Sequence, residues 1–181
     1  MRTRLTLLLA AVAVAALAGC ADEERTNTAG LAPHTGAPPS EQDRAWMRAI
    51  HQGNLAEVQA GRLAQGKGTT KELKSIGTML LDDHTALDTK VTQVASQLGI
   101  QLPTSPAADQ RAEVVRLQDA TGKDFDVEFV AGMTKAHVQA LAATKKEISG
   151  GSSPAVVALA KTAAPSLQKH LSALRKARSG N

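Results

Sequence analysis

Four histidines each fall in a different stretch of the chain with helical periodicity: His51, His84, His137 and His170. Imidazole is a ligand for zinc, copper and iron, and metal sites in helical bundles are built from side chains on facing helices. His84 stands where the surrounding apolar pattern calls for leucine, so its ring is expected to face the core. The four histidines are therefore candidate ligands of a buried metal ion.

Two carboxylates could complete such a site. Glu57 lies on the inward-facing side of its predicted helix and could add an oxygen ligand. Asp88 follows His84 by four residues, which puts the two side chains on one helical face. Asp88 could therefore orient the imidazole by accepting a hydrogen bond from its second ring nitrogen.

Two methionines leave the identity of the metal open. Met47 and Met133 each precede a histidine by four residues, so a thioether and an imidazole share one helical face. Such a pair suits copper or haem iron, whereas imidazole and carboxylate also suit zinc. Copper, zinc and iron all remain candidates.

The heights of the four histidines along their helices are similar. His51 lies 17 residues before the turn near Gly68, and His84 lies 16 residues after it. His137 lies about 14 residues before the turn at residues 151–152, and His170 lies about 19 residues after it. If the helices alternate up and down, both turns lie at one end of the bundle, and the rings lie about 22 to 28 Å from that end. We therefore expect His84, His137 and His170 to converge in the core, with His51 and Glu57 close by.

A second interpretation gives the histidines a structural role. A histidine on an apolar helix face commonly donates to a backbone carbonyl, and methionine at helical spacing commonly fills gaps in a core. The protein would then be a non-catalytic structural or protein-interaction module. The residue pattern leaves both interpretations open.

Motifs of known catalytic sites are missing from the sequence. Di-iron carboxylate proteins use paired Glu-x-x-His motifs, but the residues three before the last three histidines are Leu81, Thr134 and Leu167. The chain also lacks a nucleophile elbow, a phosphate-binding glycine loop and a His-Glu-x-x-His helix. We therefore do not expect an enzyme with one of these mechanisms, and Asp82 and Asp83 are interpreted as a solvated edge.

Apolar residues at three- and four-residue steps predict four long helices, near residues 40–65, 73–98, 124–149 and 154–178, with a short one near 107–119. Ser40 with Asp43, then Thr70, and later Pro154 mark three of the starts. Long helices joined by tight turns predict an all-α antiparallel four-helix bundle, with the short helix between the second and third long ones.

The start of the chain predicts export. Arg2 and Arg4 precede an apolar run from Leu5 to Leu17 that is typical of a signal peptide and too short to span a bilayer. Leu17-Ala18-Gly19-Cys20 then resembles the lipobox of bacterial lipoproteins. This resemblance implies a signal peptide over residues 1–19, a lipid on Cys20, and anchoring to a membrane of the cell envelope on its periplasmic or extracellular face. An ordinary signal peptide with a chance cysteine is the alternative.

The composition of the chain limits the classes of partner that the protein is expected to bind. Residues 20–39 have no apolar periodicity and predict a flexible tether, followed by one domain at residues 40–181. The single cysteine excludes an internal disulfide. The formal charge of +4 falls to +2 without Arg2 and Arg4, and there is no tyrosine and only one tryptophan. Nucleic-acid binding is therefore not expected.

Several short segments together resemble the bacterial family called domain of unknown function 4142. They are residues 60–64, 79–85 and 124–126, then Met133 with His137, and residues 165–171. Their order and spacing carry the resemblance, which runs from about residue 43 to 176. It implies a ferritin-like bundle in a secreted or envelope-attached protein, and implies no activity.

Overall fold

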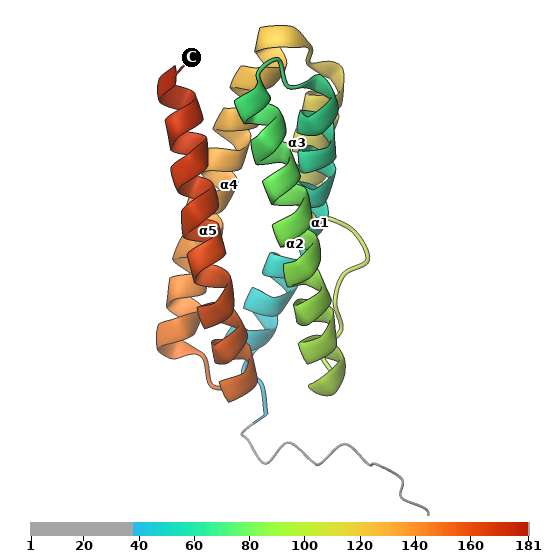
Figure 1. Cartoon of the computed structure of the whole chain (residues 1–181). Helices are drawn as coiled ribbons and strands as arrows, with labels where there is room; N and C mark the ends of the chain where they lie inside the picture. The colour runs from blue at the N-terminus through green and yellow to red at the C-terminus, as the bar shows by residue number, and fades with distance from the viewer. Residues whose placement is uncertain (1–37, 181) are drawn as a thin grey trace, which may run out of the picture. The chain divides into compact units, whose positions relative to one another are not determined.

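Five helices make up most of the structure, a computed structural model that describes residues 38–180. They are α1 (Glu41–Lys67), α2 (Lys71–Gln97), α3 (Ala108–Asp119), α4 (Gly122–Gly150) and α5 (Pro154–Gly180), as shown in Figure 1. No strand occurs between residues 38 and 180, so the all-α prediction is confirmed. Among the described helices, none is both long and apolar enough to cross a membrane. The predicted signal peptide, Cys20 and most of the tether lie outside the described residues.

Three of the helices begin where the sequence predicted. The Ser40 hydroxyl accepts a hydrogen bond from the Asp43 backbone N–H at 3.2 Å, and the Asp43 carboxylate accepts one from the Ser40 N–H at 2.6 Å. The Thr70 hydroxyl accepts from the Leu73 N–H at 3.1 Å. Pro154 is the first residue of α5. The Ser40 and Thr70 caps satisfy backbone donors that the first helical turn leaves without partners.

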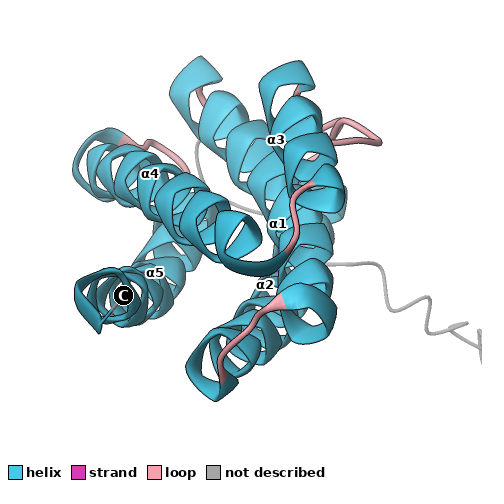
Figure 2. Cartoon of the chain, turned by 90° about the horizontal axis from the view of Figure 1, so that it is seen from above, coloured by secondary structure: helices cyan, strands magenta, loops and turns pink. Residues whose placement is uncertain are grey.

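The four long helices pair as two hairpins. α1 packs against α2, and α4 packs against α5. The hairpins meet where α1 lies against α4 and α2 lies against α5, while α3 lies outside this core beside α1 (Figure 2). The long connection between the hairpins, residues 98–121, contains α3.

The two hairpin turns lie at opposite ends of the bundle (Figure 1). The Asp43 carboxylate at the start of α1 accepts hydrogen bonds from the backbone of Ser152 and Ser153 at the start of α5, at 3.1 and 3.2 Å. At the other end, the Thr69 N–H in the α1–α2 turn donates to Asp126 near the start of α4, at 3.1 Å. The expected simple up-and-down alternation is therefore wrong. The long connection carries the chain back along the bundle, so α4 runs parallel to α2.

A polar layer divides the hydrophobic core into two clusters. One cluster, near the starts of α1 and α5, includes Trp46, Met47, Ile50, Val91, Leu159 and Leu167. The other, near the starts of α2 and α4, includes Leu73, Ile76, Leu80, Phe125, Phe129 and Leu174. Between them lie five buried polar side chains: Asn54, Glu57, His84, His137 and His170. Burying such groups is unfavourable unless they bind one another or a ligand.

Two glycines let α1 and α2 approach closely one turn from Glu57. A Cβ atom on Gly61 would lie 2.7 Å from the Gly77 carbonyl oxygen, and one on Gly77 would lie 2.7 Å from the Gly61 carbonyl oxygen. Glycine is thus required at Gly61 by the close approach of the two helices. Gly53, earlier in α1, is different, because a Cβ there would meet its nearest neighbour, the Gln110 side chain, only at 3.9 Å.

Candidate metal centre

Three imidazole rings meet in the polar layer. His84, His137 and His170 come from α2, α4 and α5 and are 2%, 0% and 1% exposed. One nitrogen from each ring lies within 4.8 Å of the others, and the ring centroids are 5.2 to 5.5 Å apart. The closest pair is the Nε2 of His137 and the Nδ1 of His170, at 3.1 Å. Each histidine lies near the middle of its helix, which brings the rings to one height.

Glu57 adds a carboxylate oxygen from α1. Its Oε2 lies 2.7 Å from the Nε2 of His84 and 3.2 Å from the Nε2 of His137. Glu57 is only 4% exposed. The short contact with His84 lacks hydrogen-bond geometry, so among the described residues neither Glu57 Oε2 nor His84 Nε2 has a hydrogen-bond partner. Two buried polar atoms thus face the centre without a hydrogen bond.

The other nitrogen of each ring points outward to an oxygen acceptor. His84 Nδ1 donates to Asn54 Oδ1 at 2.9 Å, His137 Nδ1 to the Met133 carbonyl at 2.9 Å, and His170 Nε2 to Asp83 Oδ2 at 2.8 Å. Carbonyl and carboxylate oxygens only accept, so the outer nitrogen of each ring carries the proton. In the neutral rings, the inner nitrogen therefore presents a lone pair to the centre. Histidines that bind metals in proteins are oriented in this way.

The orientation of the Asn54 amide follows from its second partner. Its Nδ2 donates to Asp88 Oδ1 at 3.2 Å, and a carboxylate oxygen only accepts. The amide oxygen of Asn54 must therefore face His84. The four-residue spacing predicted that Asp88 itself accepts from His84, but the Asn54 side chain lies between them.

The spacing of the inner atoms resembles that of metal ligands. Zinc binds imidazole nitrogen at about 2.0–2.1 Å, which puts neighbouring ligands of a tetrahedral ion about 3.3 Å apart. The contacts of His137 with Glu57 and with His170 are 3.2 and 3.1 Å. The three nitrogens and the carboxylate oxygen could therefore become ligands of one ion after small side-chain movements.

Burial and the charges of neighbouring groups shift the pKa of each titratable side chain in this centre. Burial raises the pKa of Glu57, but the charges of His84 and His137 outweigh burial and lower the pKa to about 2. Burial lowers the pKa of His84, but the Glu57 charge outweighs it, so that pKa is raised. For His137 and His170 burial prevails and lowers the pKa, to about 4 in His170. The surroundings thus favour the ionised form of Glu57 and the charged form of His84, and they favour the neutral forms of His137 and His170.

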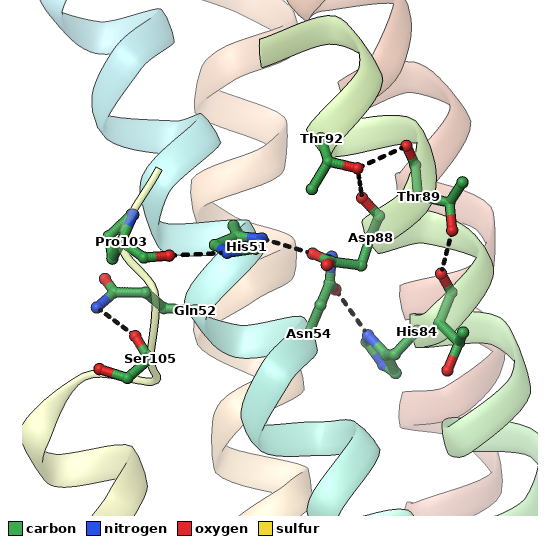
Figure 3. Close-up of polar contacts among 10 residues, drawn as sticks. His51, Gln52, Asn54, His84, Asp88, Thr89, Thr92, Pro103 and Ser105 are labelled. Atoms are coloured by element: carbon green, nitrogen blue, oxygen red, sulfur yellow. Dashed lines mark hydrogen bonds and ion pairs between the residues drawn. The ribbon is translucent and has the colours of Figure 1, made fainter. Parts of the chain in front are cut away.

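His51 lies outside the centre, contrary to its expected place beside the other histidines. Its Nδ1 is 2.8 Å from Asp88 Oδ1 and its Nε2 is 2.9 Å from the Pro103 carbonyl oxygen (Figure 3). Both of its nitrogens are therefore occupied by acceptors. Through Asp88 and Asn54, His51 is linked to His84 by hydrogen bonds (Figure 3).

Two groups that support the centre were not predicted from the sequence, Asp83 and Asn54. Asp83, interpreted as a solvated edge, accepts the hydrogen bond of His170, and its side chain is 35% exposed. Asn54 precedes Glu57 by three residues, so the two share a helix face. The three-residue spacing from Glu57 could have predicted that Asn54 also faces the centre. A pairing across helices, such as Asp83 with His170, has no such signal in the sequence.

The methionines contribute in a different way from the one expected. The Met133 carbonyl, not the thioether, is the hydrogen-bond partner of His137. Met47 packs in the apolar cluster with Trp46, away from the polar layer. Within residues 38–180, the groups that converge on the centre are thus imidazoles and a carboxylate.

Comparison with known proteins identifies the family but no function. No curated protein and no solved structure matches the chain. A family model does match, over residues 29–177, which covers most of the chain. The motif order and spacing described above agree with that match. The protein belongs to the family described as domain of unknown function (DUF4142).

Proposed function

We propose that the bundle binds one transition-metal ion through His84, His137, His170 and Glu57. The observation that carries this proposal is the orientation of the three rings. Each donates its outer N–H to an oxygen, so that inner nitrogens from three helices meet beside a buried carboxylate. A purely structural role would be served by the outer hydrogen bonds alone. It would not require three inner nitrogens and Glu57 to share one centre.

Charge supports the same proposal. The His137 and His170 inner nitrogens lie 3.1 Å apart, and when both rings are neutral their lone pairs oppose each other. A divalent cation would attract both lone pairs and the Glu57 carboxylate, and it would take the place of the proton on His84. Metal ligation by histidine commonly displaces a proton in this way.

The donor set favours zinc, iron(II) or copper(II). Imidazole nitrogen suits all three, and the carboxylate is compatible with them. Haem does not fit, because the three rings are at most 2% exposed and pack directly against one another and Glu57, which leaves no space for a porphyrin. A protein with such a site would sequester or sense a metal.

The ferritin-like fold is part of this proposal. Ferritin-like bundles have two helical hairpins joined by one long crossover. The parallel course of α2 and α4, with residues 98–121 between them, supports that topology. The ligand set differs from that of di-iron proteins, since it has one carboxylate and three histidines. We therefore propose a mononuclear centre.

Anchoring in the cell envelope completes the proposed function. It rests on the signal-like residues 1–19 and on the lipobox-like position of Cys20. The tether would let the bundle reach its metal at a distance from the membrane surface.

Metal content tests the proposal directly. The protein is loaded with zinc, copper(II) or iron(II), separated from free metal, and analysed by elemental mass spectrometry. We expect about one ion per chain, lost in His84→Gln and kept in His51→Gln, which changes a histidine outside the centre. The absence of stoichiometric binding for all three metals would instead favour the structural or interaction module.

A further inference from the structure

A cavity of about 360 Å³ lies beside the metal centre, between α1, α3 and α4. Its inner wall is largely apolar and includes Trp46, Ile50, Met133 and Ala140. The Trp46 ring is held in place by a hydrogen bond from its Nε1 to Thr144 Oγ1 at 3.2 Å. The volume falls in the range of about 300–1,000 Å³ that is typical of small-molecule sites.

The charges around the cavity balance one another. Asp109 and Glu113 on α3 face the cavity together with two basic residues, Arg116 and Lys135. Glu113 and Arg116 also form an ion pair with each other. Apart from Glu57, the lining therefore carries two negative and two positive groups, which favours an uncharged occupant over an ion.

Glu57 connects the cavity to the metal centre. Glu57 is one of the residues that line the cavity, and its Oε2 contacts His84 and His137. It is 4% exposed, and its Oε2 has no hydrogen-bond partner within the described part of the chain. A carboxylate has two oxygens, so one could bind a metal while the other accepts a hydrogen bond from an occupant.

Gly53 keeps this space open. It lies in the interior of α1, where glycine is less stable than alanine by about 1 kcal/mol. Close helix packing does not require it, because a Cβ atom there would meet nothing nearer than the Gln110 side chain at 3.9 Å. Gly53 lines the cavity one turn before Glu57.

We propose that this cavity binds a small, uncharged and largely apolar organic molecule that carries one hydrogen-bond donor, with Glu57 as the acceptor. Such a molecule would lie next to the metal ion. The metal part of this statement rests on the proposed function, but binding in the cavity does not.

The single tryptophan provides a direct test. Trp46 is the only tryptophan of the chain, which has no tyrosine, and it lines the cavity. 4-Bromophenol, an uncharged ring with one hydroxyl donor and a heavy atom that quenches tryptophan on contact, is titrated into the purified full chain. We expect saturable quenching of Trp46 emission. Gly53→Leu should raise the apparent Kd about tenfold or more, because its side chain occupies the cavity.

A matched control separates the cavity from the rest of the surface. Gly66→Leu adds the same side chain to the same helix at an exposed glycine with no atom within 4 Å of its Cβ position. It should leave the apparent Kd unchanged. If Gly53→Leu does not fold, as judged by circular dichroism, Ala140→Leu on the α4 wall takes its place. Quenching that rises linearly without saturation, or saturation that neither cavity variant weakens, would overturn the proposal.

A second measurement distinguishes failure of the cavity from failure of the metal site. Cobalt(II) is added in place of the native metal, and its visible spectrum is recorded with and without 4-bromophenol. A spectral change that Gly53→Leu abolishes supports a ligand next to the metal, and an unchanged spectrum would overturn that part. If cobalt(II) does not bind, the proposed function is in doubt, while Trp46 quenching still decides whether the cavity binds the probe.

Discussion

The inner nitrogens of His137 and His170 lie 3.1 Å apart in the buried centre of the bundle, and each ring donates its outer N–H to a separate oxygen. Their outer protons are thus held by these acceptors, and when both rings are neutral two lone pairs oppose each other inside. This relationship distinguishes the centre from an ordinary buried histidine pair, in which one ring donates to the other. It makes a cation the natural partner of the two rings.

Metal should stabilise the folded protein. An ion that binds only the folded state adds about 2.7 kcal/mol to the free energy of unfolding at one hundred times its Kd. Urea unfolding with zinc and with chelator measures this increment. We expect His84→Ala to abolish it and His51→Ala to retain it. An increment that persists in His84→Ala would locate the metal elsewhere.

The outer acceptor of His170 should tune metal affinity. Asp83→Ala removes the oxygen that holds the ring in its tautomer, and loss of such an acceptor typically weakens metal binding by about 10–100-fold. Asp82→Ala, at the exposed neighbouring position, is the matched control and should leave affinity unchanged. Competition with a chelator of known affinity measures both. Equal affinities in the two variants would contradict a role for Asp83.

Glu147 should make stability depend on pH. Burial, together with the neighbouring Asp43 carboxylate, raises the pKa of Glu147 from 4.5 to about 7 in the folded protein. The folded state therefore holds this proton more tightly than the unfolded state. Its contribution to stability is complete below pH 4.5 and is lost as the pH rises through 7.

The Glu147→Gln variant isolates this effect. Between pH 5 and pH 8 the free energy of unfolding of the wild type should fall further than that of Glu147→Gln. The difference between the two falls should be as much as about 3 kcal/mol. Glu128→Gln, at an exposed position of the same helix, should retain the wild-type dependence. Urea unfolding at the two pH values provides the comparison, and parallel behaviour of all three proteins would refute the raised pKa.

The close contact of α1 with α2 should make Gly61 intolerant of a side chain. A Cβ atom there meets backbone atoms of Gly77 at 2.7 Å and Leu81 at 2.9 Å, which cannot move independently of α2. We expect Gly61→Ala to lower the free energy of unfolding by about 1–3 kcal/mol. Gly53→Ala should raise it by up to about 1 kcal/mol, because the site is open and alanine favours helix. A neutral Gly61→Ala would mean that the helices separate easily.

The proposed lipid anchor depends on one sulfur atom. Metabolic labelling of the host bacterium with a fatty-acid analogue should label the wild-type protein, whereas Cys20→Ser should carry no label. Since Cys20 is the only cysteine, no other thiol can substitute for it. Label that persists in Cys20→Ser would rule out lipidation at this residue.

The sequence by itself determined the helices, most of their ends and the inward direction of His84. Apolar periodicity sets the face of a helix, and the Ser40 and Thr70 hydroxyls and the Pro154 ring set helix starts. All of these effects depend only on residues a few positions away in the sequence. The bounds of all five helices therefore agree with the prediction to within two residues. The family could also be identified, because short motifs in a given order and spacing are a property of the sequence alone.

The course of the second hairpin was decided only by tertiary structure. Periodicity tells which side of a helix faces the core, but not which helix lies opposite. The connection of residues 98–121 is long enough to return α4 to either end of the bundle. The histidines converge despite the wrong expectation, because each lies near the middle of its helix, and reversing a hairpin leaves the middle at the same height.

The membership of the centre was likewise decided by contacts between distant segments. His51 had the right height, but Asp88 and the Pro103 carbonyl occupy both of its ring nitrogens. Asp83 on α2 accepts a hydrogen bond from His170 on the neighbouring helix α5. No spacing in the sequence predicts this pairing. The cavity beside Glu57 depends on how α3 lies against α1 and α4, and such packing is set by the folded chain as a whole.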